Sequence, residues 1–153
     1  DIYNLYEATD VRRSLYTYNA GTGKIRMTGK YPNLTANIRM VRYAEVVLNY
    51  AEALVQTGGS NALSVLNSIP SNRNATVYAD ATLSNVLLER RKELAMEGHR
   101  FFDLMRHELP VPKVDSRQTF SGTEIPYGST LLPFPIPQAE INANSSMKQN
   151  DDY

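Results

Sequence analysis

The side chains best suited to chemistry are concentrated between residues 89 and 107. The sequence reads ERRKE at 89–93, EGHR at 97–100 and DLMRH at 103–107, so carboxylates and a histidine could serve acid–base catalysis or bind a metal. Spacing argues against both uses, because Glu97 and His99 project from different sides of one helix and cannot converge on one atom. We therefore expect no catalytic residue and no metal site.

The same charges fit a structural use. Glu93 and Glu97 lie at or near favourable helical steps from Arg100, which lies three residues before Asp103. We expect an ion-pair lattice that locks helices together. No cofactor is expected either, because NAGTGK at 19–24 lacks the spacing of a phosphate-binding loop and no G-x-S-x-G motif occurs. Cysteine is absent, which excludes disulfides, thiol catalysis and thiolate metal sites.

Composition limits the partners of the chain. Sixteen basic residues balance sixteen acidic ones in 153 residues, so no global field would recruit nucleic acid or an anionic membrane. No apolar run approaches the roughly 20 residues of a membrane-spanning helix. Tyrosine is abundant, with ten Tyr against four Phe and no Trp, and its flat apolar face with a polar tip suits wet binding surfaces as well as core edges.

Three stretches of the chain differ in character. Residues 1–38 are irregular and Tyr-rich, residues 39–106 carry helical periodicity, and residues 107–153 contain six prolines and little periodicity. The first helix is predicted from Arg39 to Thr57, with Gly58 and Gly59 ending it. Its polar residues form one narrow stripe, which predicts an interior helix covered on several sides.

A short second helix is predicted after Ser60 as N-cap, with Leu63, Leu66 and Ile69 on one face and Pro70 ending it. The two helices joined by a Gly-Gly-Ser turn resemble one tetratricopeptide unit.

The third helix is predicted to be long, from Thr82 or Ser84 to Arg106. Two residues interrupt its apolar arc. Gly98 is expected at a kink or a close backbone approach. Arg91 is expected to be buried and paired with a carboxylate of the first helix, Glu52 first and Glu45 second, because a lone buried charge costs several kcal/mol.

The last 47 residues, 107–153, are predicted to form an extended strap around the helices. Prolines within it disfavour helices and central strands. Leu132, Phe134 and Ile136 alternate, so an extended backbone places them on one side, which we expect to pack on the second and third helices. One helical hairpin and one further helix offer little surface for so much irregular chain. The expectation is a fragment of a larger helical protein, with further helices upstream.

Three sequence runs carry a family likeness. RYAEVVLNYAEAL at 42–54, ERRKELAMEGHRFFDLMRH at 89–107, and LLPFPIPQAEINAN at 131–144 followed by QNDDY resemble, in this order, the C-terminal part of the SusD-like (RagB) family of Bacteroidetes nutrient-capture lipoproteins. Asp10-Val11-Arg12 resembles the D-x-R of the family. The chain departs from the family at His107-Glu108, where Trp-Gly is common, and at its last residues, where the family often has Asn-Pro-Gly-Tyr.

The resemblance implies an all-α fold of tetratricopeptide-like helical pairs with long loops. It implies a non-catalytic, lipid-anchored protein on the outer face of the outer membrane, which binds glycans or other nutrients and works with a SusC-type TonB-dependent transporter. The N-terminal lipid anchor of the family is absent from this chain, and no ligand-binding residue is transferred from the family. If this chain contacts a sugar, we expect the contacts to be Tyr16, Tyr18 or Tyr31, whose flat rings can stack on a sugar ring. Two other hypotheses remain open: a stand-alone tetratricopeptide-like protein-interaction module, which needs stacked helical pairs, and a glycoside hydrolase, which needs two facing carboxylates about 5–9.5 Å apart.

Overall fold

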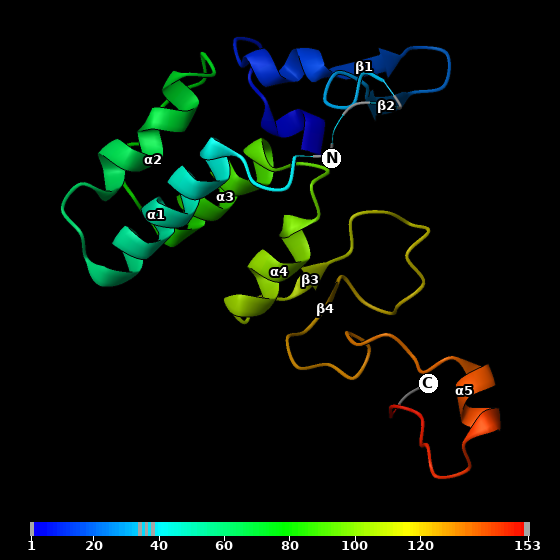
Figure 1. Cartoon of the computed structure of the whole chain (residues 1–153). Helices are drawn as coiled ribbons and strands as arrows, with labels where there is room; N and C mark the ends of the chain where they lie inside the picture. Colours follow the sequence, from blue (N-terminus) through cyan, green and yellow to red (C-terminus); the bar gives the residue numbers. More distant parts are fainter. Residues whose placement is uncertain (1, 34, 36, 38, 152–153) are drawn as a thin grey trace. The chain divides into compact units, whose positions relative to one another are not determined.

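The computed structural model describes residues 2–33, 35, 37 and 39–151. The chain forms two compact units, residues 1–100 (unit 1) and 101–153 (unit 2). The described part is mostly helical, as predicted, with small antiparallel sheets added (Figure 1). The predicted boundaries at 38 and 106 stay predictions.

The helical pair at the centre of unit 1 follows from its apolar spacing and its turn. Helix α1 (Tyr43–Thr57) ends at Gly58, whose φ of 72° is the left-handed conformation that glycine adopts without strain. Helix α2 (Ala62–Ser71) packs on α1, and a third helix, α3 (Leu83–Glu93), packs against both. Their contact buries one apolar cluster, each large side chain of which is worth about 1.5–3 kcal/mol: Ala44, Leu48, Ala51, Leu66, Ile69 and Val86.

Helix α1 is not the fully covered helix that its sequence predicted. It begins at Tyr43 rather than Arg39, because the backbone at Arg42 is extended. Leu48 is fully buried, yet Tyr43 is 83% exposed and Tyr50 51% exposed. Only one side of α1 meets α2 and α3, so the opposite side faces solvent in this chain.

The ends of α2 also differ from prediction. The N-cap is Asn61 rather than Ser60, without a side-chain hydrogen bond, and Pro70 lies one residue before the last helical residue, Ser71. Pro70 was expected to end the helix, which instead continues for one residue beyond it.

The long third helix is two helices. Thr82, one of the two predicted starts, caps α3, and its hydroxyl accepts a hydrogen bond from the Asn85 backbone N–H. The helix ends at Glu93, and helix α4 (His99–Arg106) begins after a break at residues 94–98. Met96 (φ 62°) and Gly98 (φ 82°) adopt left-handed conformations there, which a continuous helix cannot include. The kink expected at Gly98 is thus a complete break.

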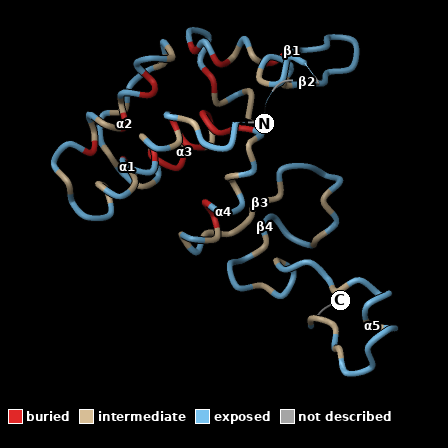
Figure 2. Tube along the Cα trace, viewed as in Figure 1, coloured by how far each residue is buried: buried red, intermediate tan, exposed pale blue. Residues whose placement is uncertain are grey.

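The first segment of unit 1 is more ordered than predicted. It contains short 3-10 helices at Ile2–Leu5 and Val11–Leu15, followed by a hairpin of strands β1 (Tyr16–Asn19) and β2 (Lys24–Met27). The register pairs Tyr16 with Met27. Buried residues lie mainly on this segment and on α1–α3 (Figure 2).

Unit 2 contains a minimal sheet of β3 (Val111–Pro112) and β4 (Glu124–Ile125) and a short helix, α5 (Gln138–Ala143). The prediction that prolines exclude helices here was wrong for α5, because Pro137 occupies the N-cap, where its missing N–H costs nothing. Phe134 is 93% exposed, and its predicted packing on the second and third helices, which belong to unit 1, stays a prediction. Leu132 and Ile136 are half-buried.

Hydrogen bonds from a side-chain amide hold the proline-rich segment in place. The Gln149 side chain accepts a hydrogen bond from the Ile136 N–H and donates one to the Ile136 carbonyl.

Within the described residues, no helix has the length and apolar character needed to cross a membrane.

Candidate functional site

The most densely charged part of unit 1 is a buried cluster centred on Arg12. Asp10 caps the second 3-10 helix by accepting a hydrogen bond from the Arg12 N–H, and its carboxylate also accepts from Arg12 Nε at 2.9 Å and Nη2 at 2.8 Å. Arg12 Nη1 reaches Glu89 Oε1 at 2.6 Å and Glu93 Oε2 at 3.1 Å. Arg12 is 4% exposed and Glu89 is fully buried, so these charges are neutralised by one another rather than by water. We call Asp10, Lys30, Arg42, Arg73, Glu89, Lys92, Glu93 and Glu97, together with Arg12, the charged cluster.

Glu93 connects the largest number of segments in the charged cluster. Glu89 and Glu93 are four residues apart on α3 and therefore share a face. Besides Arg12, the Glu93 carboxylate accepts hydrogen bonds from Arg42 Nη1 at 3.0 Å and from Arg73 Nη2 at 2.9 Å. Burial alone would raise the pKa of Glu93, but the guanidinium groups of Arg73 and Arg42 outweigh it and lower that pKa to about 2.

The break between α3 and α4 supplies acceptors to the same cluster. Where a helix ends, the last backbone carbonyls have no hydrogen-bond partner within the helix and can accept hydrogen bonds from other segments. The Glu93 carbonyl accepts from Arg42 Nη2 at 2.9 Å, and the Ala95 carbonyl from Lys30 Nζ at 2.8 Å. The Glu97 side chain, within the break, accepts from Arg42 and forms an ion pair with Lys30. The break thus joins α3 to the start of α1 and to the segment after β2.

Tyrosines border the cluster on its buried side. Tyr6 donates to the Lys92 carbonyl at 2.7 Å and lies 3.1 Å, oxygen to oxygen, from the hydroxyl of Tyr16. Tyr78 donates to Glu89 Oε2 at 2.9 Å. Burial raises the pKa of Tyr6 and of Tyr78 well above the usual value, so both hydroxyls remain protonated donors at neutral pH.

This arrangement favours the structural hypothesis for the charges. Throughout the part of the chain that the structure describes, every buried side-chain nitrogen or oxygen has a hydrogen-bond partner, and no group of three potential metal ligands occurs. A carboxyl group with a pKa of about 2 is ionised at neutral pH, so Glu93 cannot act as a general acid there. The predicted lattice is present, but Glu93 and Glu97 pair with cations from distant segments rather than within one helix.

The buried arginine of α3 is Arg90 and not Arg91. Arg90 is 2% exposed, its Nε lies 3.6 Å from Glu52 Oε2, and its Nη1 donates to Asn49 at 2.5 Å. Arg91 is half-buried. The prediction chose the right partner and missed the arginine by one residue, because it averaged the apolar face over a helix that ends at Glu93.

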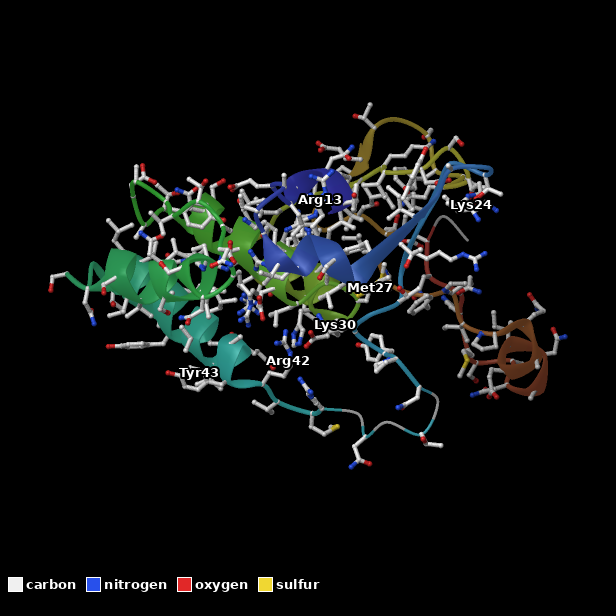
Figure 3. The ribbon with its side chains drawn as sticks, turned by 90° about the horizontal axis from the view of Figure 1, so that it is seen from above. Arg13, Lys24, Met27, Lys30, Arg42 and Tyr43 are labelled. Atoms are coloured by element: carbon white, nitrogen blue, oxygen red, sulfur yellow. The ribbon has the colours of Figure 1, made fainter. Side chains whose placement is uncertain are left out.

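Two cavities open beside the cluster. The first, of about 470 Å³, lies between the hairpin, the segment after it and the cluster, and we call it the hairpin cavity. Figure 3 shows Met27, Lys30 and Arg42, all of which line it, on the same side of the unit. The second, of about 630 Å³, lies between the start of α1 and the end of α2, with Tyr43 and Ile69 in its wall. The sequence predicted neither, since residues distant along the chain form both.

The tyrosines proposed as sugar contacts differ in accessibility. Tyr16 is buried against the rings of Tyr3 and Tyr6, so its ring is not available to a sugar. Tyr18 is 57% exposed on the hairpin. Tyr31 is 54% exposed, lines the hairpin cavity, and donates to the Met96 carbonyl at 2.8 Å.

In the sequence, only the family likeness singles out Asp10-Val11-Arg12. The signal that could have identified it is an Asp at an N-cap position two residues before an arginine.

Fold and cluster together define a mostly helical protein that is held together by a buried ion-pair lattice. The chain belongs to the SusD family, whose family model matches residues 14–153. It is similar to the starch-binding protein SusD of Bacteroides thetaiotaomicron, 29% identical over 136 residues that cover 86% of this chain and 24% of that protein. The chain spans about a quarter of the length of the curated relatives it matches.

Solved structures agree with the family assignment. A SusD superfamily protein from Bacteroides thetaiotaomicron matches with a TM-score of 0.77 and 32% identity, covering 96% of this chain and 39% of that one. Surface glycan-binding protein A from the same species, in complex with laminarihexaose, matches with a TM-score of 0.69 and 25% identity over 97% of this chain and 39% of that one. The predicted family and the mostly helical fold class are therefore confirmed.

Proposed function

We propose that the chain is part of a non-catalytic glycan-binding protein of an outer-membrane uptake system. Membership in the SusD family carries this proposal, because relatives that match over most of the chain include a starch-binding protein and a surface glycan-binding protein. In the proposed setting the protein lies on the outer face of the outer membrane. It passes glycans or other nutrients to a SusC-type TonB-dependent transporter.

The described carboxylates support a non-catalytic role. A glycosidase needs one carboxyl group that can donate a proton and a second that remains ionised. In the charged cluster, Glu89 and Glu93 are buried and accept hydrogen bonds from arginine or tyrosine side chains, and Glu89 also forms an ion pair with Lys92. Such neutralised carboxylates maintain the packing of segments and are not poised for proton transfer.

A stand-alone tetratricopeptide-like module is the alternative. That class binds peptides on the concave surface of stacked helical pairs. Among the described residues, α1 and α2 form one such pair, and α3 and α4 are short helices separated by a break. A single pair provides no concave surface, so this hypothesis has less support than glycan binding.

Affinity gel electrophoresis of the full chain tests the glycan-binding proposal. Gels that contain starch, laminarin, xylan or pectin should retard the native chain in at least one polysaccharide. The heat-denatured chain and a non-binding albumin serve as controls. Equal mobility of the folded chain in every gel would contradict the proposal.

A second experiment tests the transporter partnership. The protein carrying this chain would be tagged and crosslinked on intact cells of its source, and its crosslinked partners identified by mass spectrometry. A TonB-dependent transporter should be enriched relative to a tagged, unrelated surface lipoprotein. Equal recovery of the transporter with both proteins would contradict the partnership.

A further inference from the structure

The hairpin cavity has two chemically different walls. One is apolar and is formed by Leu15, Met27, Pro32 and the ring of Tyr31. The rest of the lining carries cationic groups that belong to, or adjoin, the charged cluster. Small-molecule sites are commonly cavities of about 300–1,000 Å³ lined by apolar surface with a few polar groups, and this cavity of about 470 Å³ falls in that range.

Positive charge exceeds negative charge in this wall. Six cations line the cavity against the two carboxylates Glu93 and Glu97. The two further acids of the cluster, Asp10 and Glu89, are already bound by Arg12 and Lys92. Among the described residues, Arg39 lines the cavity and forms no ion pair, so one guanidinium faces this space without a carboxylate partner.

The ring of Tyr31 is held in place beside that charge. Its hydroxyl donates to the Met96 carbonyl at 2.8 Å, which anchors the side chain to the break between α3 and α4. The ring nevertheless remains 54% exposed. An anchored aromatic face costs little conformational entropy when a ligand stacks on it, and it offers an apolar surface to the C–H face of a sugar ring.

We propose that the hairpin cavity binds an anionic sugar unit of an acidic glycan, one that carries a carboxylate or a sulfate. Arg39 receives the anionic group, and Tyr31 stacks on the sugar ring. The inference rests on the proposed glycan-binding function and adds the class of sugar and the place where it binds. A neutral sugar would satisfy the apolar wall and leave the excess positive charge uncompensated, which is why the anionic class fits best.

Isothermal titration calorimetry on the full chain tests the proposal with matched ligands. The probes are a galacturonic acid tetrasaccharide, its fully methyl-esterified form, a sulfated carrageenan tetrasaccharide and neutral maltotetraose. Esterification removes the charge and keeps the sugar backbone, so it isolates the electrostatic contribution. The carboxylated and sulfated probes distinguish the two sources of negative charge.

Three variants and two matched controls locate the site. Arg39→Gln removes the unpaired cation, and its control is Arg26→Gln, an exposed arginine on β2 outside the cavity. Tyr31→Ala removes the ring, and its control is Tyr18→Ala, a tyrosine of similar exposure, 57%, on the hairpin. Tyr31→Phe keeps the ring and loses only the hydrogen bond to Met96. Circular dichroism confirms that each variant is folded.

The expected result is a Kd at least about tenfold lower for one anionic probe than for its uncharged counterpart, weakening as salt is added. Arg39→Gln should raise that Kd about tenfold or more and Tyr31→Ala should raise it, whereas both controls stay within about twofold. If neither anionic probe binds more tightly than the ester and maltotetraose, or if Arg39→Gln leaves the Kd unchanged, the proposal is overturned. If only neutral glycans bind, this inference fails and glycan binding stands. If no glycan binds, both fail.

Discussion

Replacing Glu93 by glutamine removes the charge that joins four segments of unit 1. The shape of the side chain is kept, but Arg12, Arg42 and Arg73 lose their shared anion. Breaking a buried ion pair by removing one partner costs about 3–5 kcal/mol, because the remaining charges stay buried without compensation. We expect Glu93→Gln to lower the free energy of unfolding of unit 1 by that amount.

The lowered pKa of Glu93 gives an independent magnitude. The difference between the ordinary value of 4.5 and the value of about 2 in the fold corresponds to about 3 kcal/mol. Because the folded-state pKa lies below the unfolded one, this stabilisation is fully present above about pH 4.5. It is lost as pH falls from there to about 2. The difference in stability between native chain and variant should therefore shrink over this interval.

Urea denaturation followed by far-ultraviolet circular dichroism, at pH 7 and at steps from 5 to 2, measures both quantities. Glu140→Gln is the control: this exposed carboxylate lies in unit 2, and its loss should change stability by less than about 0.5 kcal/mol. A Glu93→Gln variant within about 1 kcal/mol of the native chain at pH 7 would refute the reasoning. A difference that stays constant down to pH 2 would refute the assigned cause.

Three further predictions use the same assay. Gly58→Ala should cost about 1 kcal/mol, because alanine is strained at the φ of 72° that ends α1; an unchanged urea midpoint would contradict this. Arg12→Lys should cost about 2 kcal/mol or more, because an ammonium cannot reproduce the paired contacts to Asp10 at 2.9 and 2.8 Å; a native-like midpoint would show that charge alone suffices. Tyr6→Phe should cost about 1–2 kcal/mol, since its hydroxyl donates to the buried Lys92 carbonyl; a more stable variant would argue against that hydrogen bond.

Local signals predicted the parts of the fold that local chemistry determines. The end of α1 at Gly58 and the start of α3 at Thr82 follow from backbone conformation and capping, which a few neighbouring residues settle. The burial of Leu66 and Ile69 follows from helical spacing on a short helix.

The break at residues 94–98 could not be predicted from spacing. Met96 adopts a left-handed conformation that methionine does not prefer, and long-range contacts compensate for it. Lys30 and Arg42 donate to the carbonyls that the break exposes, and both lie more than 50 residues away in sequence. Glycine at 98 signalled a kink but could not show its extent.

The charged cluster could be predicted only in part, because its ion pairs also join residues that are distant in sequence. Residue types and density indicated an ion-pair lattice, whereas its actual partners, Arg12, Arg42 and Arg73, come from segments whose proximity only the fold establishes. The family likeness identified the class of protein. The hairpin cavity could be located only from the structure, because residues distant in sequence line it.

The most direct test of non-catalytic glycan binding combines two readouts on one sample. Soluble oligosaccharides of starch, laminarin, xylan and pectin are titrated into the full chain by isothermal titration calorimetry. The oligosaccharide recovered from the calorimeter's sample cell is then analysed by mass spectrometry to measure its molecular mass. We predict saturable binding of at least one oligosaccharide, recovered at its original mass. A folded chain that releases no heat with any of them, or returns shortened products, would contradict the account.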